Sequence, residues 1–251
     1  MKVGILGATG AVGRQMLASI EERNIEVDEI RLFASLKSVG KKFAYKNTYI
    51  DLSHLDSTKG VTCYVNTTNR CPCACTFCLR QTKEMMENNS LWLKEEPSKE
   101  MIIEEFKKYD LNDFKEIVFC GFGEPMERWD DIKEVIDYIR DTKKDMKIRI
   151  NTNGLANDIY GRDVTPEYKG RFDTVSISLN APTKEEFLEL TRSKFGISSF
   201  DDMLDFAKKC KAYVPNVVLT VVDIIGEEKI EACQKITDEI GVTLRVRPFE
   251  E

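Results

Sequence analysis

Residues 69–80 read NRCPCACTFCLR and place four of the chain's eight cysteines within eight positions, at Cys71, Cys73, Cys75 and Cys78. A disulfide framework spreads its cysteines through a short secreted chain, and a structural zinc site adds a second cysteine couple or histidines further along. The other four cysteines stand alone here, and the chain has one histidine. The spacing therefore favours a metal or cluster site in a reducing compartment.

Length and composition narrow the possible classes of protein. The 251 residues allow one large domain or two small ones, and 43 acidic against 37 basic side chains leave a net charge of −6. This balance argues against nucleic acid as a partner. No uncharged apolar run approaches the ~18 residues of a spanning helix, and the N-terminus lacks the plan of a signal peptide. We expect a soluble, cytoplasmic protein without membrane contact.

Strand and helix patterns alternate from residue 61 to the end. Short segments rich in Val, Ile, Thr and Phe predict six strands, at 61–68, 116–123, 147–154, 173–180, 216–223 and 243–249. Apolar residues at spacings of three and four predict amphipathic helices at 98–110, 130–142, 200–213 and 228–240. Alternating elements imply parallel strands joined by right-handed crossovers. We therefore predict an α/β fold, a partial (βα)6 barrel.

The unusual motifs all follow predicted strands. After the cysteine-rich loop come GFGEP (121–125), NTNG (151–154) and SLN (178–180), and the last strand carries Arg245 and Arg247. Ligands of a parallel barrel gather at the C-terminal strand ends, so these motifs are expected at one rim. Glycines that leave room for a ligand, with a glutamate just beyond, suit a small zwitterion.

Residues 61–251 resemble the radical S-adenosylmethionine (SAM) superfamily. The resemblance is carried by CxxxCxxC at Cys71, Cys75 and Cys78, by Phe77 before the last cysteine, and by GFGEP, which is similar to the family's GGEP-type motif. The segments NRC, CTFCLR, LWLKEEPS and RVRPF are similar to small radical SAM proteins encoded beside TatD-type nucleases.

The resemblance implies a 4Fe-4S cluster on Cys71, Cys75 and Cys78. Three thiolates bind three irons, and the fourth iron stays open to SAM. Cys73 is predicted to be a bystander that points away from the cluster. An electron from reduced flavodoxin or ferredoxin would cleave SAM to methionine and a 5'-deoxyadenosyl radical, which abstracts hydrogen from an unidentified substrate, small or macromolecular.

Contacts to SAM are carried over only where the motifs match. Residues 121–124 would hold the methionine amino group, strand four the ribose or carboxylate, and the last strand the adenosine side. Phe122 stands where a second glycine is usual, so local backbone contacts are expected to differ. The predicted SAM-binding residues are Gly121, Phe122, Gly123, Glu124, Asn153, Ser178, Asn180 and Arg247.

Residues 1–43 carry a different pattern. KVGILGATGAVGRQML spaces Gly7, Gly10 and Gly13 as in a dinucleotide-binding turn between a strand and a helix. The segment resembles the N-terminus of aspartate-semialdehyde dehydrogenase, and this resemblance implies an NADP phosphate contact at Ser35, Lys37 and Ser38.

This N-terminal unit is too small to hold a dinucleotide by itself. A dinucleotide lies across two βαβ halves, and the dehydrogenase's catalytic cysteine and histidine belong to parts that the chain lacks. We predict a Rossmann-like βαβ fragment that binds no nucleotide and is dispensable for radical chemistry. Residues 44–60 are polar and turn-rich, which indicates a linker or accessory hairpin before the barrel of 61–251.

Other functions remain open at this point. Within radical SAM chemistry, a glycyl-radical activase-like or a deazapurine-synthase-like role also suits a minimal barrel. An NADP-dependent oxidoreductase acting through the N-terminal glycine motif and a zinc-dependent binding module are alternatives from other classes. No substrate motif and no catalytic side chain can be assigned from the residues.

Overall fold

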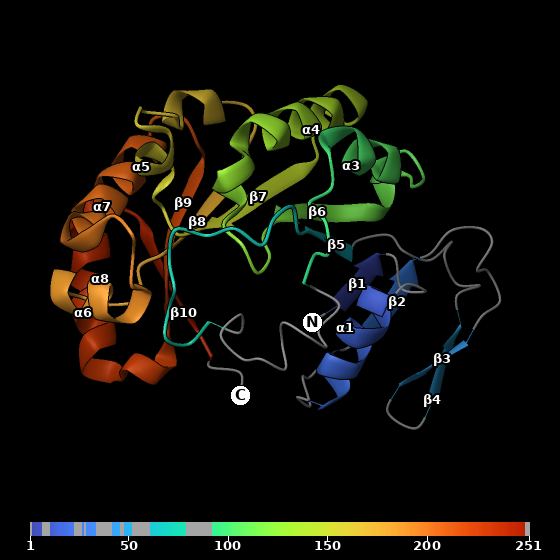
Figure 1. The fold of residues 1–251 in the computed structure, drawn as a ribbon, viewed down its shortest axis with the longest axis horizontal. Helices are drawn as coiled ribbons and strands as arrows, with labels where there is room; N and C mark the ends of the chain where they lie inside the picture. Colours follow the sequence, from blue (N-terminus) through green and yellow to red (C-terminus); the bar gives the residue numbers. More distant parts are fainter. Residues whose placement is uncertain are drawn as a thin grey trace.

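The computed structural model of the chain describes residues 2–6, 11–22, 27, 29–33, 42–45, 48–51, 61–78 and 92–248 (Figure 1). Several residues of the sequence-based predictions lie outside this part. They include Gly7 and Gly10 of the glycine turn, the phosphate-contact candidates Ser35, Lys37 and Ser38, the single histidine, His54, and most of the predicted linker or hairpin of residues 44–60.

A parallel six-stranded sheet forms the larger part of the molecule. Its strands follow one another in chain order, each hydrogen-bonded to the next, from β5 at one edge to β10 at the other, and the sheet does not close. They are β5 (Val61–Val65), β6 (Phe114–Phe119), β7 (Lys147–Thr152), β8 (Thr174–Ser178), β9 (Asn216–Val222) and β10 (Thr243–Arg247). The predicted partial barrel is confirmed, with several strands ending earlier than predicted because the motif residues belong to the loops.

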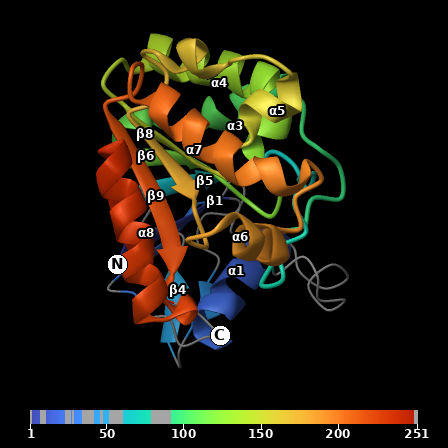
Figure 2. The same ribbon diagram turned by 90° about the vertical axis from the view of Figure 1, so that its left-hand side faces the viewer.

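Helices cover one face of this sheet (Figures 1 and 2). They are α3 (Lys99–Phe106), α4 (Trp129–Thr142), α5 (Ala156–Tyr160), α6 (Lys184–Thr191), α7 (Ser199–Cys210) and α8 (Glu227–Ile240). Short 3-10 turns are η4 (Leu111–Asp113), η5 (Pro125–Arg128), η6 (Thr165–Tyr168), η7 (Gly196–Ser198) and η8 (Asp223–Ile225). Helices α5 and α6 were not predicted from the sequence. The start of α6 did carry a signal, since Thr183 caps it by accepting a hydrogen bond from the Glu186 amide.

Alternation along the strands separates an apolar face from a polar one. Ile117, Ile148 and Ile150 point toward the helices and are fully buried in the core. On the opposite face, the Arg149 guanidinium forms a two-pronged ion pair with Glu116, with N···O distances of 3.2 and 3.0 Å. The concave side of the open barrel therefore carries this ion pair, whereas the three isoleucines belong to the core on the helix-covered side.

The N-terminal elements form a separate small unit. Strand β1 (Lys2–Leu6) pairs in parallel with β2 (Glu29–Phe33) across α1 (Ala11–Glu22), as the βαβ prediction requires. An antiparallel hairpin follows, made of β3 (Lys42–Tyr45) and β4 (Thr48–Asp51).

A core of its own holds this unit together. Ile5, Leu17 and Leu32 are buried against one another, and β1 lies alongside β5 without joining its hydrogen-bonded ladder (Figure 1). Considering all the helices of both units, none in the described part of the chain is long and apolar enough to cross a bilayer.

Candidate active site

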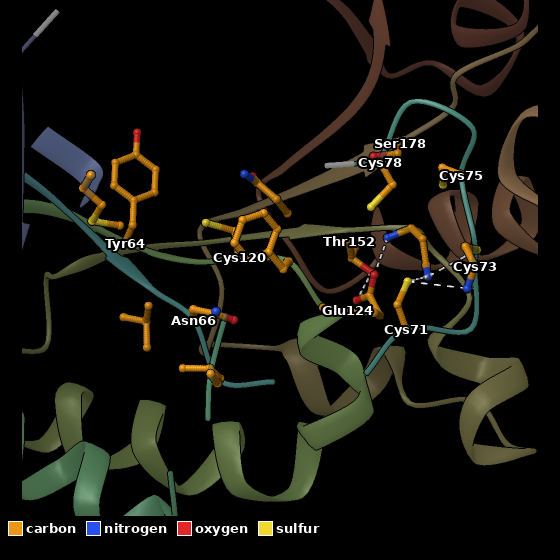
Figure 3. A pocket seen from close by; sticks show the side chains of 18 of the residues that line it. Tyr64, Asn66, Cys71, Cys73, Cys75, Cys78, Cys120, Glu124, Thr152 and Ser178 are labelled. Carbon is orange, nitrogen blue, oxygen red and sulfur yellow. Dashed lines mark hydrogen bonds between the residues drawn. The ribbon is translucent and has the colours of Figure 1, made fainter. Parts of the chain in front are cut away.

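One cavity of about 980 Å³ opens at the C-terminal ends of the strands (Figure 3). It gathers the residues predicted for the cluster and for SAM from five separate segments of the chain. Its lining includes Cys71, Cys75, Cys78, Gly121, Phe122, Gly123, Glu124, Asn153, Ser178, Asn180 and Arg247. Every predicted site residue therefore meets in one place, as the strand-end rule for parallel barrels requires.

The cysteine loop is fastened to the end of α6 by backbone hydrogen bonds. The amides of Ala74 and Thr76 donate to the carbonyls of Thr191 and Leu190 at 2.9 and 2.8 Å, and the Lys194 amide donates to Pro72 at 2.9 Å. Alternate amides of the loop thus bond outward, as in an extended strand. These backbone hydrogen bonds to residues 190–194 therefore fix the shape of the cysteine loop.

Cys73 does not point away from the other thiols, as the sequence analysis expected. It is only 4% exposed, and its thiol makes hydrogen bonds with Cys71 and Cys75. These hydrogen bonds raise the pKa of Cys73, and burial adds to the rise. The reason is the extended backbone, in which residues i, i+2 and i+4 share a side, while Ala74 and Thr76 take the exposed positions.

The donor set fits an iron-sulfur cluster in its chemistry, because thiolates are the ligands that such clusters use. Among the residues that the structure describes, no three His, Cys, Asp or Glu side chains converge tightly enough to hold a single metal ion. A cube makes a different demand, because each thiolate binds its own iron. The thiols of Cys71, Cys73, Cys75 and Cys78 all line one roomy cavity, so the three predicted ligands are available to such a cube. The side-chain amide nitrogen of Asn153 lies beside this loop, 3.9 Å from the sulfur of Cys71 and 3.8 Å from that of Cys73.

The two glycines of GFGEP allow a close approach of two backbone segments. A Cβ on Gly123 would lie 2.2 Å from the Thr68 carbonyl oxygen, and one on Gly121 would lie 2.1 Å from Oδ1 of Asn66. From the sequence, these glycines were predicted to leave room for a ligand. The packing supplies another reason, because the Glu124 amide donates to the Arg70 carbonyl at 2.7 Å and ties this loop to the start of the cysteine loop.

Glu124 forms a buried junction in the cavity wall, between the ends of β6 and β7. Its side chain accepts hydrogen bonds from the Thr152 hydroxyl at 2.7 Å, the Asn153 amide at 2.7 Å and the Met126 amide at 3.1 Å. Burial raises the pKa of Glu124 to about 8, the Cys71 thiolate adds to the rise, and the three hydrogen bonds oppose it. The carboxylate thus joins the end of β6 to the end of β7 and orients Asn153.

Asn180 closes the fourth strand in a conformation that side chains rarely adopt. Its φ is 62°, in the left-handed region where asparagine is tolerated better than most residues. The amides of Leu179 and Asn180 both donate to the Thr220 carbonyl, at 2.9 and 3.3 Å. The turn holds Asn180 at the cavity wall, next to Ser178.

Residues 65–239 match the Radical SAM superfamily. This chain belongs to the radical SAM superfamily. Solved structures agree on the fold of this superfamily member. SuiB from Streptococcus suis superposes with a TM-score of 0.56 at 16% identity, over 80% of this chain and 42% of that one. SuiB bound to S-adenosylmethionine superposes with a TM-score of 0.53 at 18% identity, again over 80% of this chain and 42% of that one. Methylornithine synthase (PylB) gives 0.52 at 15%, over 78% of this chain and 56% of that one.

The N-terminus of this radical SAM protein matches another family. Residues 2–70 match the NAD-binding domain of semialdehyde dehydrogenase. The chain is 32% identical to aspartate-semialdehyde dehydrogenase of Aquifex aeolicus over 120 residues, which are 45% of this chain and 35% of that protein. It is 58% identical to aspartate-semialdehyde dehydrogenase of Streptomyces akiyoshiensis over 40 residues, which are 16% of this chain and 12% of that protein. The chain thus spans about a third or less of these relatives.

The cavity also contains residues that the sequence analysis did not select. Tyr64, Cys120 and Asn151 line it from the strand ends, and Tyr64 and Cys120 lie away from the cysteine loop (Figure 3). Their signal was available, since each sits in or just after a predicted strand. Side chains of β1 and α1 line it too, and no local pattern in the sequence pointed to that contact.

Proposed function

We propose that this protein is a radical SAM enzyme that holds a 4Fe-4S cluster on Cys71, Cys75 and Cys78, binds SAM against it, and abstracts hydrogen from an unidentified substrate. The observation that carries the proposal is the single cavity in which these three thiols meet the GFGEP loop and the ends of β7 and β8. The family membership of residues 65–239 supports it independently.

Each segment of the cavity has a distinct part in this function. When bound, the cluster would supply the electron that splits SAM into methionine and a 5'-deoxyadenosyl radical. The backbone of Gly121–Glu124 and the Asn153 amide would receive the methionine end, with Ser178 and Asn180 on the ribose or carboxylate side and Arg247 on the adenosine side. These side chains offer the hydrogen bonds that a zwitterion with a sugar requires.

Electrons would enter through the cysteine loop. Ala74 and Thr76 are exposed on its outer side, while Cys71 and Cys75 face the cavity from the same few residues. A reduced flavodoxin or ferredoxin that touched this surface would therefore approach the thiol-bearing loop closely. We propose such a donor as the physiological reductant.

The test is reductive cleavage of SAM under anaerobic conditions. Reconstituted protein is expected to carry about four irons and four sulfides, as one cube requires, and to release 5'-deoxyadenosine with dithionite and SAM, measured by mass spectrometry. Cys71→Ala serves as the control and should lose both the iron and the product. Iron-loaded wild-type protein that releases no 5'-deoxyadenosine would overturn the proposal.

A further inference from the structure

The N-terminal unit reaches into the cavity of the barrel. Side chains from both β1 and α1 are part of its lining: Val3, Ile5, Met16, Ser19 and Ile20. The same unit buries Leu17 and Leu32 in its own core, so the lining residues are held on a folded support. Figures 1 and 2 both show β1 next to β5, and α1 packs against β1.

The position of this unit follows from the open barrel. The six-stranded sheet ends at β5 on one side and at β10 on the other. Arg247 at the end of β10 and Met16 on α1 line the same cavity, and β1 lies alongside β5. The N-terminal unit therefore stands at the opening that the unclosed sheet leaves.

The two sides of the cavity differ in chemistry. Strand ends contribute hydrogen-bonding side chains, both the uncharged Asn66, Asn151 and Asn180 and the charged Glu124 and Arg247. The N-terminal side contributes apolar Met16 and Ile20. A methionine side chain is flexible and polarisable, so it adapts to differently shaped apolar groups.

We propose that β1 and α1 form the closing wall of the active site, and that Met16 and Ile20 contact an apolar part of the substrate whose hydrogen-bonding groups meet the asparagine-rich rim. The substrate part of this inference rests on the proposed function. The sequence-based expectation that the unit is dispensable for radical chemistry stays a prediction, and the proposed wall predicts the opposite.

The wall can be tested on the full-length protein without its cofactors, through the reactivity of its own thiols. Cys120 lines the cavity, whereas Cys210 and Cys233 are fully buried in the helical core and report on global unfolding. Replacing Met16→Ser together with Ile20→Ser removes the apolar wall without adding a charge. Glu22→Ser is the matched control, because Glu22 is exposed on the same helix.

Labelling of each cysteine by N-cyclohexylmaleimide is followed by mass spectrometry. The double variant should label Cys120 about tenfold faster than wild type, which corresponds to about 1.4 kcal/mol of lost protection, with Cys210 and Cys233 unchanged. Ser19→Trp should have the opposite effect, because a larger side chain on the wall fills the cavity and slows labelling. Equal rates of Cys120 labelling in wild type, the double variant and Ser19→Trp would overturn the proposal that β1 and α1 form the closing wall.

The substrate contact has a separate readout in the same experiment. Wild-type Cys120 should react faster with the cyclohexyl reagent than with a maleimide that carries a carboxylate, relative to free cysteine, and the double variant should lose this preference. No preference in wild type would refute the apolar contact. Because the labelling needs neither iron nor SAM, failure of the wall is distinguishable from failure to release 5'-deoxyadenosine, which tests the proposed function alone.

Discussion

Replacing Glu124 tests how this buried side chain, which joins the ends of β6 and β7 in the cavity wall, supports cofactor binding. Glu124→Ala removes the acceptor for the Thr152 hydroxyl and for the amides of Met126 and Asn153. A buried donor left without a partner costs about 1–3 kcal/mol, so three of them set an upper range of roughly 3–9 kcal/mol for the loss in the free energy of unfolding. Water that enters from the cavity lowers this loss. Globular domains have about 5–15 kcal/mol in total.

Glu124→Gln separates the two roles of this side chain, which are to stabilise the fold and to position Asn153 for SAM binding. The amide oxygen can still accept from Thr152 and Met126, but its NH2 group faces the Asn153 amide, so one hydrogen bond is lost and a loss of about 1–3 kcal/mol is expected. Displacing Asn153 should weaken SAM binding roughly ten- to a hundredfold while the iron content stays that of wild type.

Urea unfolding of the cofactor-free protein, iron determination and a calorimetric SAM titration measure these effects. The matched comparison is Glu127→Gln, because Glu127 lies in the same turn and binds Arg70 at the surface. If Glu124→Ala weakened SAM binding without lowering the unfolding midpoint, the carboxylate would act as a direct SAM contact and the junction argument would be wrong. Wild-type stability and affinity in both Glu124 variants would refute either role.

The remaining predictions concern the cluster loop, the glycines and acid stability. Cys73→Ala should retain iron and SAM cleavage, whereas alanine at any proposed ligand should abolish both; iron loss in Cys73→Ala refutes the ligand assignment. Gly123→Ala should lower iron and SAM binding by pushing the cysteine loop away, while Gly161→Ala, where a Cβ meets open space, should cost about 1 kcal/mol of stability and leave both unchanged. Burial opposes ionisation of Glu167, but hydrogen bonds from a lysine, an arginine and an indole lower its pKa to about 2. This depressed value stabilises the fold above pH ~4.5 and is lost as the pH falls toward 2, so Glu167→Gln should flatten the fall of the urea midpoint over that range, and an unchanged slope would contradict it.

Much of the fold could be predicted because its signals are local and periodic. The strands read as runs of β-branched and aromatic residues, and helices such as α4 and α8 repeat their apolar residues at helical spacing. The helix α5 is too short to display a repeat of apolar residues at helical spacing, and α6 has a weak apolar stripe. Neither helix was therefore predicted. Strand ends were placed too late wherever the motif that follows is itself rich in strand-forming or small residues.

The candidate site was predictable for a topological reason. Parallel strands in chain order bring their C-terminal ends to one rim, so motifs that follow strands must meet there. The side-chain partners at that rim were not predictable in the same way. The hydrogen bond between Glu124 and Thr152 joins residues 28 positions apart, and no spacing rule relates them.

The sequence by itself determined the class of protein, because CxxxCxxC, the strand–helix alternation and the motifs after each strand are patterns of neighbouring residues. Only the tertiary structure decided that Cys73 faces the same side as Cys71 and Cys75, since that depends on the backbone bonds to the end of α6. It also decided that Met16 and Ile20 line the cavity of a barrel that begins some forty residues later. Contacts of this kind depend on which surfaces are left uncovered once each unit has folded, and a local pattern carries no information about them.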